Sequence, residues 1–400
     1  MTLFRHGLRK VRRDGVYQFC KQAKEEVVQD NILRHYTGGK IDEETDITTV
    51  NEISNSGHLI SRDCIETDLH EIPRKESVKS DEQITDIQAD EPCPQVCGIV
   101  NGATVLASSG IVSLPDGRFV ADSVGPVHLA SRRVSVALSM FGYQHGFAQL
   151  RAVLPSTEQD LQPDRTVDKA IVLIPLWSNY FHWTVECLLK LHWLERYRKT
   201  SSDNVKIIVP RTLSSWMHES LSLLGYDESD YISAESRKII VNELLIPSQI
   251  EPIPAHVNWL RDRISDSVEV TEQEDKRIYI TRRKATKRRV RNEGEVITAL
   301  RTRGFEPYAL ESLSVSEQVR LFSNSSAVVG PHGAGFANII YSNDTTVIEL
   351  FGQKRLNTYQ RLATALGFGY EPVYCDGHGS DLVVDTDNLL KTVDDQLSTI

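Results

Sequence analysis

The chain has 400 residues, of which 40% are hydrophobic and 25% are charged, and its formal net charge at pH 7 is −10. A chain of this length and composition exceeds one typical domain and has enough apolar surface for a large core, which excludes a small disulfide scaffold and global disorder. No stretch approaches the roughly 18 consecutive apolar residues of a membrane-spanning helix, so the sequence predicts no span.

Residues 1–40 are predicted to form a basic amphipathic amino-terminal arm. The first 13 residues hold five Lys or Arg and no acid, and their apolar residues recur at helical spacing. We interpret the arm as a solvated leading helix; the alternative is peripheral contact of residues 1–24 with the inner face of an anionic membrane. Sparse cysteines and the lack of an apolar leader region predict a reducing, cytoplasmic compartment.

Residues 41–92 carry the acidic excess of the chain. They contain 15 Asp or Glu against four Lys or Arg, a balance of −11, and they are poor in aromatic residues. Such a segment buries too little apolar surface to offset the entropy of ordering. We therefore expect a flexible or loosely ordered surface segment.

Residues 93–255 are predicted to form an amino-terminal α/β domain. Apolar runs between turn-forming residues first indicate short strands at Thr104–Leu106, Ile111–Leu114 and Arg133–Leu138. Strands and helices then alternate, as in β-α-β units. The expected strands are Ala170–Ile174, Val205–Val209 and Lys238–Leu245, and the expected helices are Phe181–Arg198 and Ser214–Leu224.

A second α/β domain is expected at residues 276–400, after a linker between Ile246–Pro254 and Glu269–Lys276. Its expected strands are Arg277–Thr281, Phe305–Leu310, Ala327–Gly330, Thr346–Phe351 and Tyr370–Tyr374. Its expected helices are Glu293–Arg303, Ser314–Ser323, Ala334–Tyr341 and Asn357–Leu366. Strands separated by helices favour a parallel, doubly wound sheet, in which ligands bind beyond the carboxyl ends of the strands.

A glycine-rich loop joins a strand to a helix in residues 328–338. Gly330, Gly333 and Gly335 lack Cβ atoms, so backbone N–H groups can approach a ligand, and the helix that starts near Ala334 directs its positive end to the same place. This pattern predicts a site for the diphosphate of a nucleotide, with His332 as an added donor. Asn338 is expected to cap or pack within the helix. The alternative is a tight turn whose glycines serve packing alone.

Basic residues surround the first strand of the same domain. Eight of the 15 residues from Arg277 to Arg291 are Lys or Arg, and arginines that face one cleft can grip phosphates bidentately. Strand alternation favours Arg282 or Arg283 for this role. We expect Lys284, Lys287 and Arg288 to form a solvated face.

Glu349 closes the strand that follows the glycine loop. A carboxylate at the carboxyl end of a strand can accept hydrogen bonds from both hydroxyls of a ribose, as the acidic residue of dinucleotide sites does. The alternative is an ion pair with a neighbouring arginine.

His182 and Glu186 open a helix of the first domain, directly after a buried strand. Residues four apart share one face of a helix, so the carboxylate can orient the imidazole as a general base for an alcohol. The alternatives are a pair that only stabilises the helix, or a core histidine bonded to a backbone carbonyl.

Together these segments resemble the family 61 glycosyltransferases, which include plant xylan xylosyl- and arabinosyltransferases and animal protein O-GlcNAc transferases. The resemblance is distinct over residues 276–370 and looser at Tyr180–Trp183 and Glu186, and residues 1–150 match no family that we can name. Phe336–Ala337 stand where the family often has Leu-Thr, a mild departure. The clearest motifs are Tyr279–Arg283, Arg291–Glu293, Gly304–Phe305, Glu317–Gln318, Gly330–Gly335, Asn338 and Val347–Leu350.

This resemblance implies a GT-B architecture, with two Rossmann-like domains whose parallel sheets face each other across a cleft. It implies an inverting, metal-independent transfer of a hexosyl, pentosyl or N-acetylhexosaminyl group from a nucleotide-sugar co-substrate, without a cofactor. By the same resemblance, the first domain approaches the acceptor with His182 and Glu186. The second domain holds the donor with Arg282, Arg283, Asn292, Glu293, His332, Gly333, Ala334, Gly335 and Glu349.

The sequence therefore predicts a glycosyltransferase that moves a sugar, linked to uridine diphosphate, to a glycan, a lipid-linked glycan or a surface polysaccharide. The rival is a non-catalytic protein that binds nucleotides or polyanions. A nucleic-acid partner is disfavoured, because aromatic residues are few in the basic run and the chain is acidic. No metal site is expected: Cys93 and Cys97 lack a second ligand pair, and Asp385-Thr-Asp387 precedes a helix for which Asp387 is a suitable cap.

Overall fold

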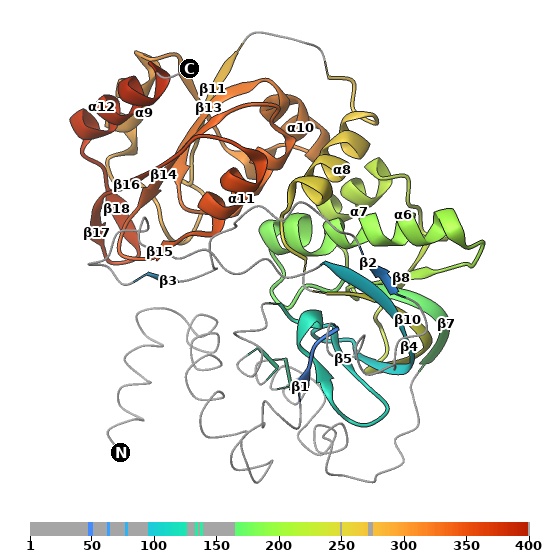
Figure 1. Ribbon diagram of the computed structural model, residues 1–400. Coiled ribbons are helices and arrows are strands. Elements are labelled where there is room, and N and C mark those ends of the chain that lie inside the picture. Colours follow the sequence, from blue (N-terminus) through green and yellow to red (C-terminus); the bar gives the residue numbers. More distant parts are fainter. Residues whose placement is uncertain are drawn as a thin grey trace, which may run out of the picture.

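The structure, a computed structural model, describes residues 47–50, 62–64, 77–78, 95–125, 133–134, 137–138, 165–248, 250–270 and 275–398. The basic arm of residues 1–40 lies outside this part of the chain. Two sheets dominate the fold, and helices lie between them and on the outer face of the second sheet (Figure 1). Among the described residues, no helix has the length and apolar character needed to cross a membrane.

The first sheet is mixed rather than fully parallel. Its strands are β1 (Ile47–Thr48), β2 (Arg62–Cys64), β4 (Val96–Leu106), β5 (Ile111–Ser113), β6 (Phe119–Val120), β7 (Arg165–Val172), β8 (Lys206–Val209), β9 (Tyr231–Ser233) and β10 (Lys238–Pro247). The order is β1-β6-β5-β4-β10-β7-β8-β9, with β2 attached to β4. β7 pairs in parallel with β10 and β8, as the alternating elements predict, whereas β4 runs antiparallel to β10 along their whole contact. The prediction of a parallel sheet thus holds for the strands β10, β7, β8 and β9, whereas β4, β5 and β6 pair in antiparallel fashion.

The long helix expected after β7 is built from three pieces of different pitch. They are the π-helix η5 (His182–Cys187), the 3₁₀ turn η6 (Leu188–Lys190) and α6 (Leu191–Thr200). α7 (Ser215–Leu223) and α8 (Pro254–Ser265) complete the helices of this half. The strand expected at Arg133–Leu138 is wrong, because its four described residues are helical and buried.

The second sheet confirms the predicted doubly wound topology. Its strands are β11 (Lys276–Ile280), β12 (Phe305–Tyr308), β13 (Ser325–Pro331), β14 (Thr346–Phe351) and β16 (Tyr370–Tyr374). All neighbours are parallel, and the spatial order β12-β11-β13-β14-β16 corresponds to 2-1-3-4-5 in chain order. In this order the connections change direction at β11 and β13.

Helices cover both faces of the second sheet, because alternate side chains of each strand enter different cores. Ile278 packs toward α10 (Val315–Ser323), η8 (Ala334–Tyr341) and α11 (Thr358–Leu366), whereas the adjacent Tyr279 packs toward α9 (Glu293–Arg301) and α12 (Thr386–Leu397). This alternation is what a strand buried on both faces requires.

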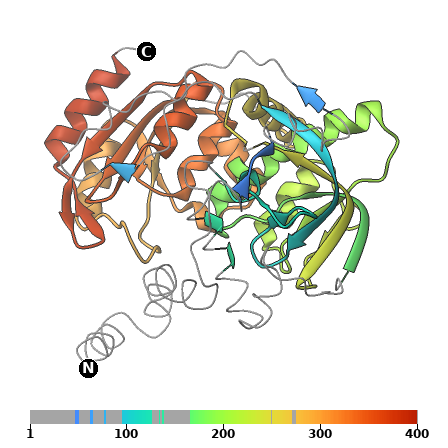
Figure 2. The same cartoon turned by 60° about the horizontal axis from the view of Figure 1, so that its bottom comes forward.

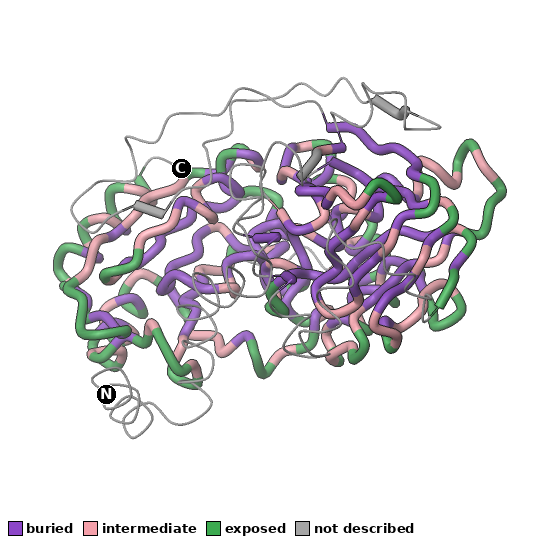
Figure 3. Tube along the Cα trace, turned by 90° about the horizontal axis from the view of Figure 1, so that it is seen from below, coloured by how far each residue is buried: buried purple, intermediate pink, exposed green. Residues whose placement is uncertain are grey.

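A single hydrophobic core joins the two sheets. The cluster that contains Trp183 and Leu260 from the first half also contains Phe322 and Leu362 from the second. The helices that carry these side chains meet in the middle of the molecule (Figures 1 and 2), where much of the chain trace is coloured as buried (Figure 3). α8, which follows the proline-rich segment expected to begin the linker, therefore packs into this core.

The acidic segment 41–92 contributes three short strands to the described structure. β1 pairs with β6 and β2 with β4, while β3 (Ser77–Val78) pairs with β15 (Arg355–Leu356) of the second half. These short strands attach parts of the segment to both halves. The acidic composition of the segment does not predict this pairing.

Candidate nucleotide-sugar site

The predicted glycine loop lies at the point of the second sheet where the direction of the connections reverses. β11 is followed by Thr281 and Arg282, and the adjacent β13 is followed by His332 and Gly333. In open α/β sheets the crevice outside the carboxyl ends of these two strands is where ligands bind. The fold therefore places the two motifs with the strongest sequence signal side by side.

Two glycines of the loop permit close approaches of different kinds. A Cβ atom on Gly330 would lie 2.9 Å from Cβ of Ile280, so this glycine lets β13 pack against β11. A Cβ atom on Gly333 would lie 2.1 Å from Nη1 of Arg282, so this glycine makes room for a guanidinium group. Gly330 thus serves packing, while Gly333 leaves space for an arginine, and the binding of a ligand at this loop stays a prediction.

The helix after the loop is a 3₁₀ helix with the predicted bounds, Ala334–Tyr341. Its first turn is closed by a bond from N of Phe336 to O of Gly333 at 3.1 Å. The N–H groups of Ala334 and Gly335 precede this bond and lie at the positive end of the helix, which is the arrangement that favours an anion.

Arg282 lies over the glycine loop, whereas Arg283 is exposed. Nη2 of Arg282 donates to the carbonyl of Lys287 at 3.2 Å, and its buried Nε has no hydrogen-bond partner in the described part of the chain. Burial, and then the neighbouring charge of Arg288, lower the pKa of Arg282. A half-buried cation with an unused donor and a like charge beside it is unfavourable until an anion binds.

Arg288 belongs to the site, although the charge run predicts a solvated position for it. It is half-buried, and Tyr359 and Glu349 lie close enough to influence its charge. Its φ of 58° is the only positive value of a non-glycine residue in the described ranges. This backbone conformation has no signal in the sequence. Lys284 and Lys287 are exposed, as predicted.

Glu349 is completely buried and orients His332. Its Oε1 lies 2.5 Å from Nδ1 of His332, and its Oε2 accepts a bond from the hydroxyl of Tyr370 at 2.6 Å. Both oxygens are thus engaged by side chains rather than by an arginine, and the expected ribose contact stays a prediction. The bond at Nδ1 fixes the ring and leaves Nε2 for a ligand.

Asn292 and Glu293 attach the basic loop to neighbouring parts of the second half. Asn292 exchanges two bonds with the backbone of Val384, and Oε1 of Glu293 accepts from the hydroxyls of Tyr279 and Thr281 at 3.2 and 2.5 Å. These bonds hold Thr281 directly before Arg282. A direct contact of Asn292 or Glu293 with a donor remains a prediction.

His182 and Glu186 form the predicted pair in η5. Nδ1 of His182 lies 2.6 Å from Oε2 of Glu186, and the two side chains are 14% and 25% exposed. The bond at Nδ1 leaves Nε2 as the atom that can accept a proton. Trp177, whose ring centroid lies 5.3 Å from that of His182, is 38% exposed.

A chain of aromatic rings connects His182 with the glycine loop. Phe181 contacts His182 and also Tyr359 of α11, with centroid separations of 5.3 and 5.6 Å. Tyr359 in turn lies 5.4 Å from His332. The structure thus brings the two histidines, which are predicted to serve acceptor and donor, into one cluster across the two halves.

Asn338 joins the halves at the same place. It is fully buried, accepts a bond from the hydroxyl of Tyr180 at 2.8 Å and donates to Gln318 at 2.8 Å and to O of Gly335 at 3.0 Å. The predicted packing role of Asn338 is confirmed, with a partner from the first half.

No group of three or more His, Cys, Asp or Glu side chains that could hold a metal ion occurs among the described residues. The cap of α12 is Asp385, which accepts from N of Asp387 and N of Asn388, so the assignment of the cap to Asp387 is wrong. Cys97 is buried in β4, and Cys93 lies outside the described residues.

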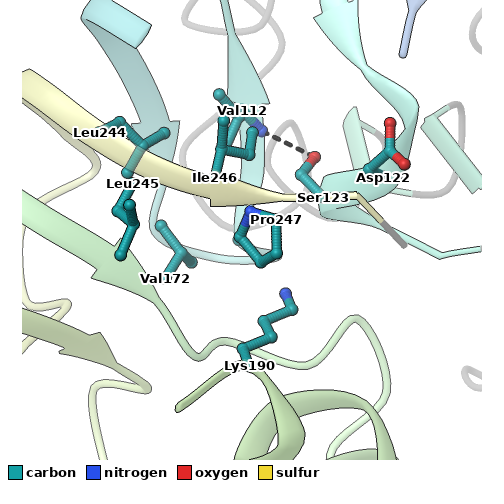
Figure 4. A pocket seen from close by; sticks show the side chains of 10 residues that line it. Val112, Asp122, Ser123, Val172, Lys190, Leu244, Leu245, Ile246 and Pro247 are labelled. Atoms are coloured by element: carbon teal, nitrogen blue, oxygen red, sulfur yellow. Dashed lines mark hydrogen bonds between the residues drawn. The ribbon is translucent and has the colours of Figure 1, made fainter. Parts of the chain in front are cut away.

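A small cavity in the first half lies apart from these residues. It opens at the carboxyl ends of β7 and β10, and the side chain of Lys190 points toward it past Pro247 (Figure 4). Its lining is mostly apolar and includes none of the predicted site residues.

No signal in the sequence marks Tyr359 and Tyr370, since isolated tyrosines in a helix and a strand carry no motif. Burial raises the pKa of Tyr359 above its usual range, and the Glu349 carboxylate adds to this effect. The hydroxyl of Tyr359 therefore stays neutral, near Arg282, Arg288 and the ring of His332.

A doubly wound parallel sheet with a glycine-rich, basic loop at the point of reversal is an arrangement typical of α/β proteins that bind nucleotides. The family model described as Glycosyltransferase 61 matches residues 180–348, in agreement with the resemblance that the motifs indicate. The EGF domain-specific O-linked N-acetylglucosamine transferase of Gallus gallus is 31% identical over 100 residues. That match covers 24% of this chain and 19% of the relative.

Proposed function

We propose that this chain is an inverting, metal-independent glycosyltransferase of GT-B architecture. It moves a sugar from a uridine diphosphate-linked donor to a hydroxyl group of a glycan, a lipid-linked glycan or a surface polysaccharide. The observation that supports this best is the pair of half-buried arginines, Arg282 and Arg288, beside Gly333. Among the described residues, neither forms an ion pair with a carboxylate.

The donor's diphosphate would bind between these arginines and the start of η8. Guanidinium groups contact phosphate oxygens in bidentate fashion, and the N–H groups of Ala334 and Gly335 add oriented donors. His332, held by Glu349 at Nδ1, adds a side-chain donor to the same anion when its Nε2 carries a proton. These groups stabilise the charge that develops on the diphosphate as it leaves.

The acceptor would approach from the side of His182. Nε2 of His182 takes the proton of the acceptor hydroxyl while the acceptor oxygen forms its bond to the anomeric carbon and the bond to the diphosphate oxygen breaks. The Glu186 carboxylate stabilises the imidazolium that forms. A single in-line displacement of this kind inverts the anomeric configuration.

The resemblance implies transfer of a hexosyl, pentosyl or N-acetylhexosaminyl group and does not select one of them. The name of the relative from Gallus gallus makes N-acetylglucosamine the first candidate sugar and an EGF domain one candidate acceptor. The chain spans about a fifth of that relative's length, so both assignments are proposals for this protein.

The decisive experiment measures release of uridine diphosphate from UDP-N-acetylglucosamine, UDP-glucose and UDP-xylose, with and without a chelator. We expect slow release from at least one donor without acceptor, at the same rate in both conditions. A strict requirement for added manganese would contradict the metal-independent mechanism. Nucleotide binding without turnover, even with glycan acceptors, would instead favour a non-catalytic nucleotide- or polyanion-binding protein.

A further inference from the structure

The basic loop between β11 and α9 is shaped by a distant hairpin. β17 (Asp376–His378) and β18 (Asp381–Val383) form this hairpin near the end of the chain. N of Arg288 donates to O of Ser380 at 2.8 Å, and N of Leu382 donates to O of Arg289 at 3.0 Å. A parallel bridge between Val290 and Leu382 continues this pairing. The loop is therefore attached to β18 by these backbone bonds and the single bridge.

Asp381 forms the strongest link of this pairing. Its side chain is 6% exposed and accepts bonds from N of Arg289 at 3.2 Å and from Nη2 of Arg289 at 2.9 Å. Burial opposes its ionisation, but the bonds from Arg289 prevail and keep the pKa of Asp381 below its usual range. The carboxylate thus holds both the backbone and the side chain of the residue next to Arg288.

The conformation of Arg288 needs such a restraint. A non-glycine residue with a positive φ is conformationally strained and persists only where its surroundings fix it. Here the bonds to Ser380 and Asp381 fix the residues on which its backbone depends. Half-buried in this conformation, Arg288 lies beside Arg282 and Tyr359.

We propose that Asp381 is a positioning residue for the donor: through Arg289 it holds Arg288 in the left-handed conformation in which its guanidinium faces the diphosphate beside Arg282. The proposal rests on the proposed function, because it assigns Arg288 to the donor. Asp381 itself touches neither substrate, and its effect reaches the site through the backbone of the loop.

The test compares binding of uridine diphosphate by titration calorimetry in the full chain, with thermal unfolding as the check of folding. Asp381→Ala should weaken binding about tenfold, the loss expected when one charge-assisted contact to phosphate is misplaced. Arg288→Ala should weaken it to a similar extent. The double variant should bind no more weakly than Arg288→Ala, because both changes remove the same contact.

Three controls separate positioning from general stability. Asp394→Asn removes another Arg–Asp pair of the same half, Arg303–Asp394, and should leave binding unchanged. Asp381→Asn keeps an acceptor for N of Arg289 and should bind with intermediate affinity. In turnover assays, Asp381→Asn should raise the KM for the donor and leave the KM for the acceptor unchanged.

The outcomes are distinct. Wild-type affinity in a folded Asp381→Ala protein, or additive losses in the double variant, would overturn the proposal. If Asp381→Ala does not fold, the same decision rests on Asp381→Asn, for which unchanged affinity would overturn it. Failure of the wild-type chain to bind uridine diphosphate would instead refute the proposed function.

Discussion

Adjacent residues of the basic loop have different environments, and their roles follow from burial rather than from charge. Arg282 is half-buried over Gly333 with an unused Nε donor, whereas Arg283 is exposed to solvent. Water screens the exposed guanidinium, so a phosphate gains little from it, while the buried one acts in a medium of lower dielectric constant.

The substitution Arg282→Ala should therefore weaken binding of uridine diphosphate by about 10- to 100-fold, the range for loss of charged hydrogen bonds. The matched change Arg283→Ala should alter the affinity less than about twofold. Titration calorimetry of the two variants checks this. Equal losses would show that the loop acts through its net charge alone.

At the acceptor side, His182→Ala should abolish sugar transfer while the affinity for uridine diphosphate stays near that of the wild type. The reason is that Nε2 of His182 is the proposed proton acceptor, whereas the residues proposed to contact the donor belong to the second half. General-base loss costs about 10²- to 10⁴-fold in rate. Normal turnover of this variant in a transfer assay would remove His182 as the base.

At the scale of elements, the contact of α8 with α6 contains two histidines, of which His256 is fully buried and His192 is half-buried. His256 near the start of α8 is 0% exposed, and its Nδ1 donates to O of Glu251 at 3.0 Å, while its Nε2 has no partner in the described residues. The ring of His192 lies 5.3 Å away. Burial lowers the pKa of both side chains to about 4.

This contact should make the protein sensitive to acid. Because the pKa of His256 in the folded state lies below its usual value near 6.5, the unfolded chain binds more protons between these values. Stability should therefore be complete above about pH 6.5 and fall as the pH drops toward 4, by up to about 3 kcal/mol for His256.

Urea unfolding at pH 7 and pH 5 measures this loss, and the uncharged variant His256→Gln should show a smaller difference between the two pH values than the wild type. The same pH dependence in the variant and the wild type would show that other groups cause the acid sensitivity.

At the scale of the whole molecule, hydrogen bonds between the two halves add to the contacts of the common hydrophobic core. Glu219 of α7 accepts bonds from N of Val315 and N of Ser316, at 2.8 and 2.9 Å, and thus binds the amino end of α10 from the other half. A carboxylate at this end of a helix satisfies free N–H groups and interacts favourably with the helix dipole.

Glu219→Ala should lower the free energy of unfolding by about 1–2 kcal/mol, as expected for the loss of a helix cap. Because the core is continuous, we expect a single unfolding transition at a lower midpoint rather than two. The exposed Glu228→Ala in the same half is the control and should leave the midpoint unchanged. Two separated transitions in the wild type would contradict the cooperative coupling of the halves.

The sequence by itself determined the elements of the second half and the location of its loop. Burial on both faces gives short apolar strands, and helices have local caps such as Ser314, which forms a capping box with Glu317. These signals depend on neighbouring residues, so all five strands and the glycine loop could be predicted. The pair His182–Glu186 could be predicted for the same reason, since its members lie four positions apart.

Only the tertiary structure decided which side chains meet. The antiparallel pairing of β4 with β10 made the first sheet mixed, and residues 92 positions apart fixed the basic loop through Asp381 and Arg289. The engagement of Glu349 by His332 and Tyr370 arose in the same way. Contacts between distant residues depend on packing geometry, which leaves no period or spacing in the sequence, so Arg288 could be assigned to the site only from the fold.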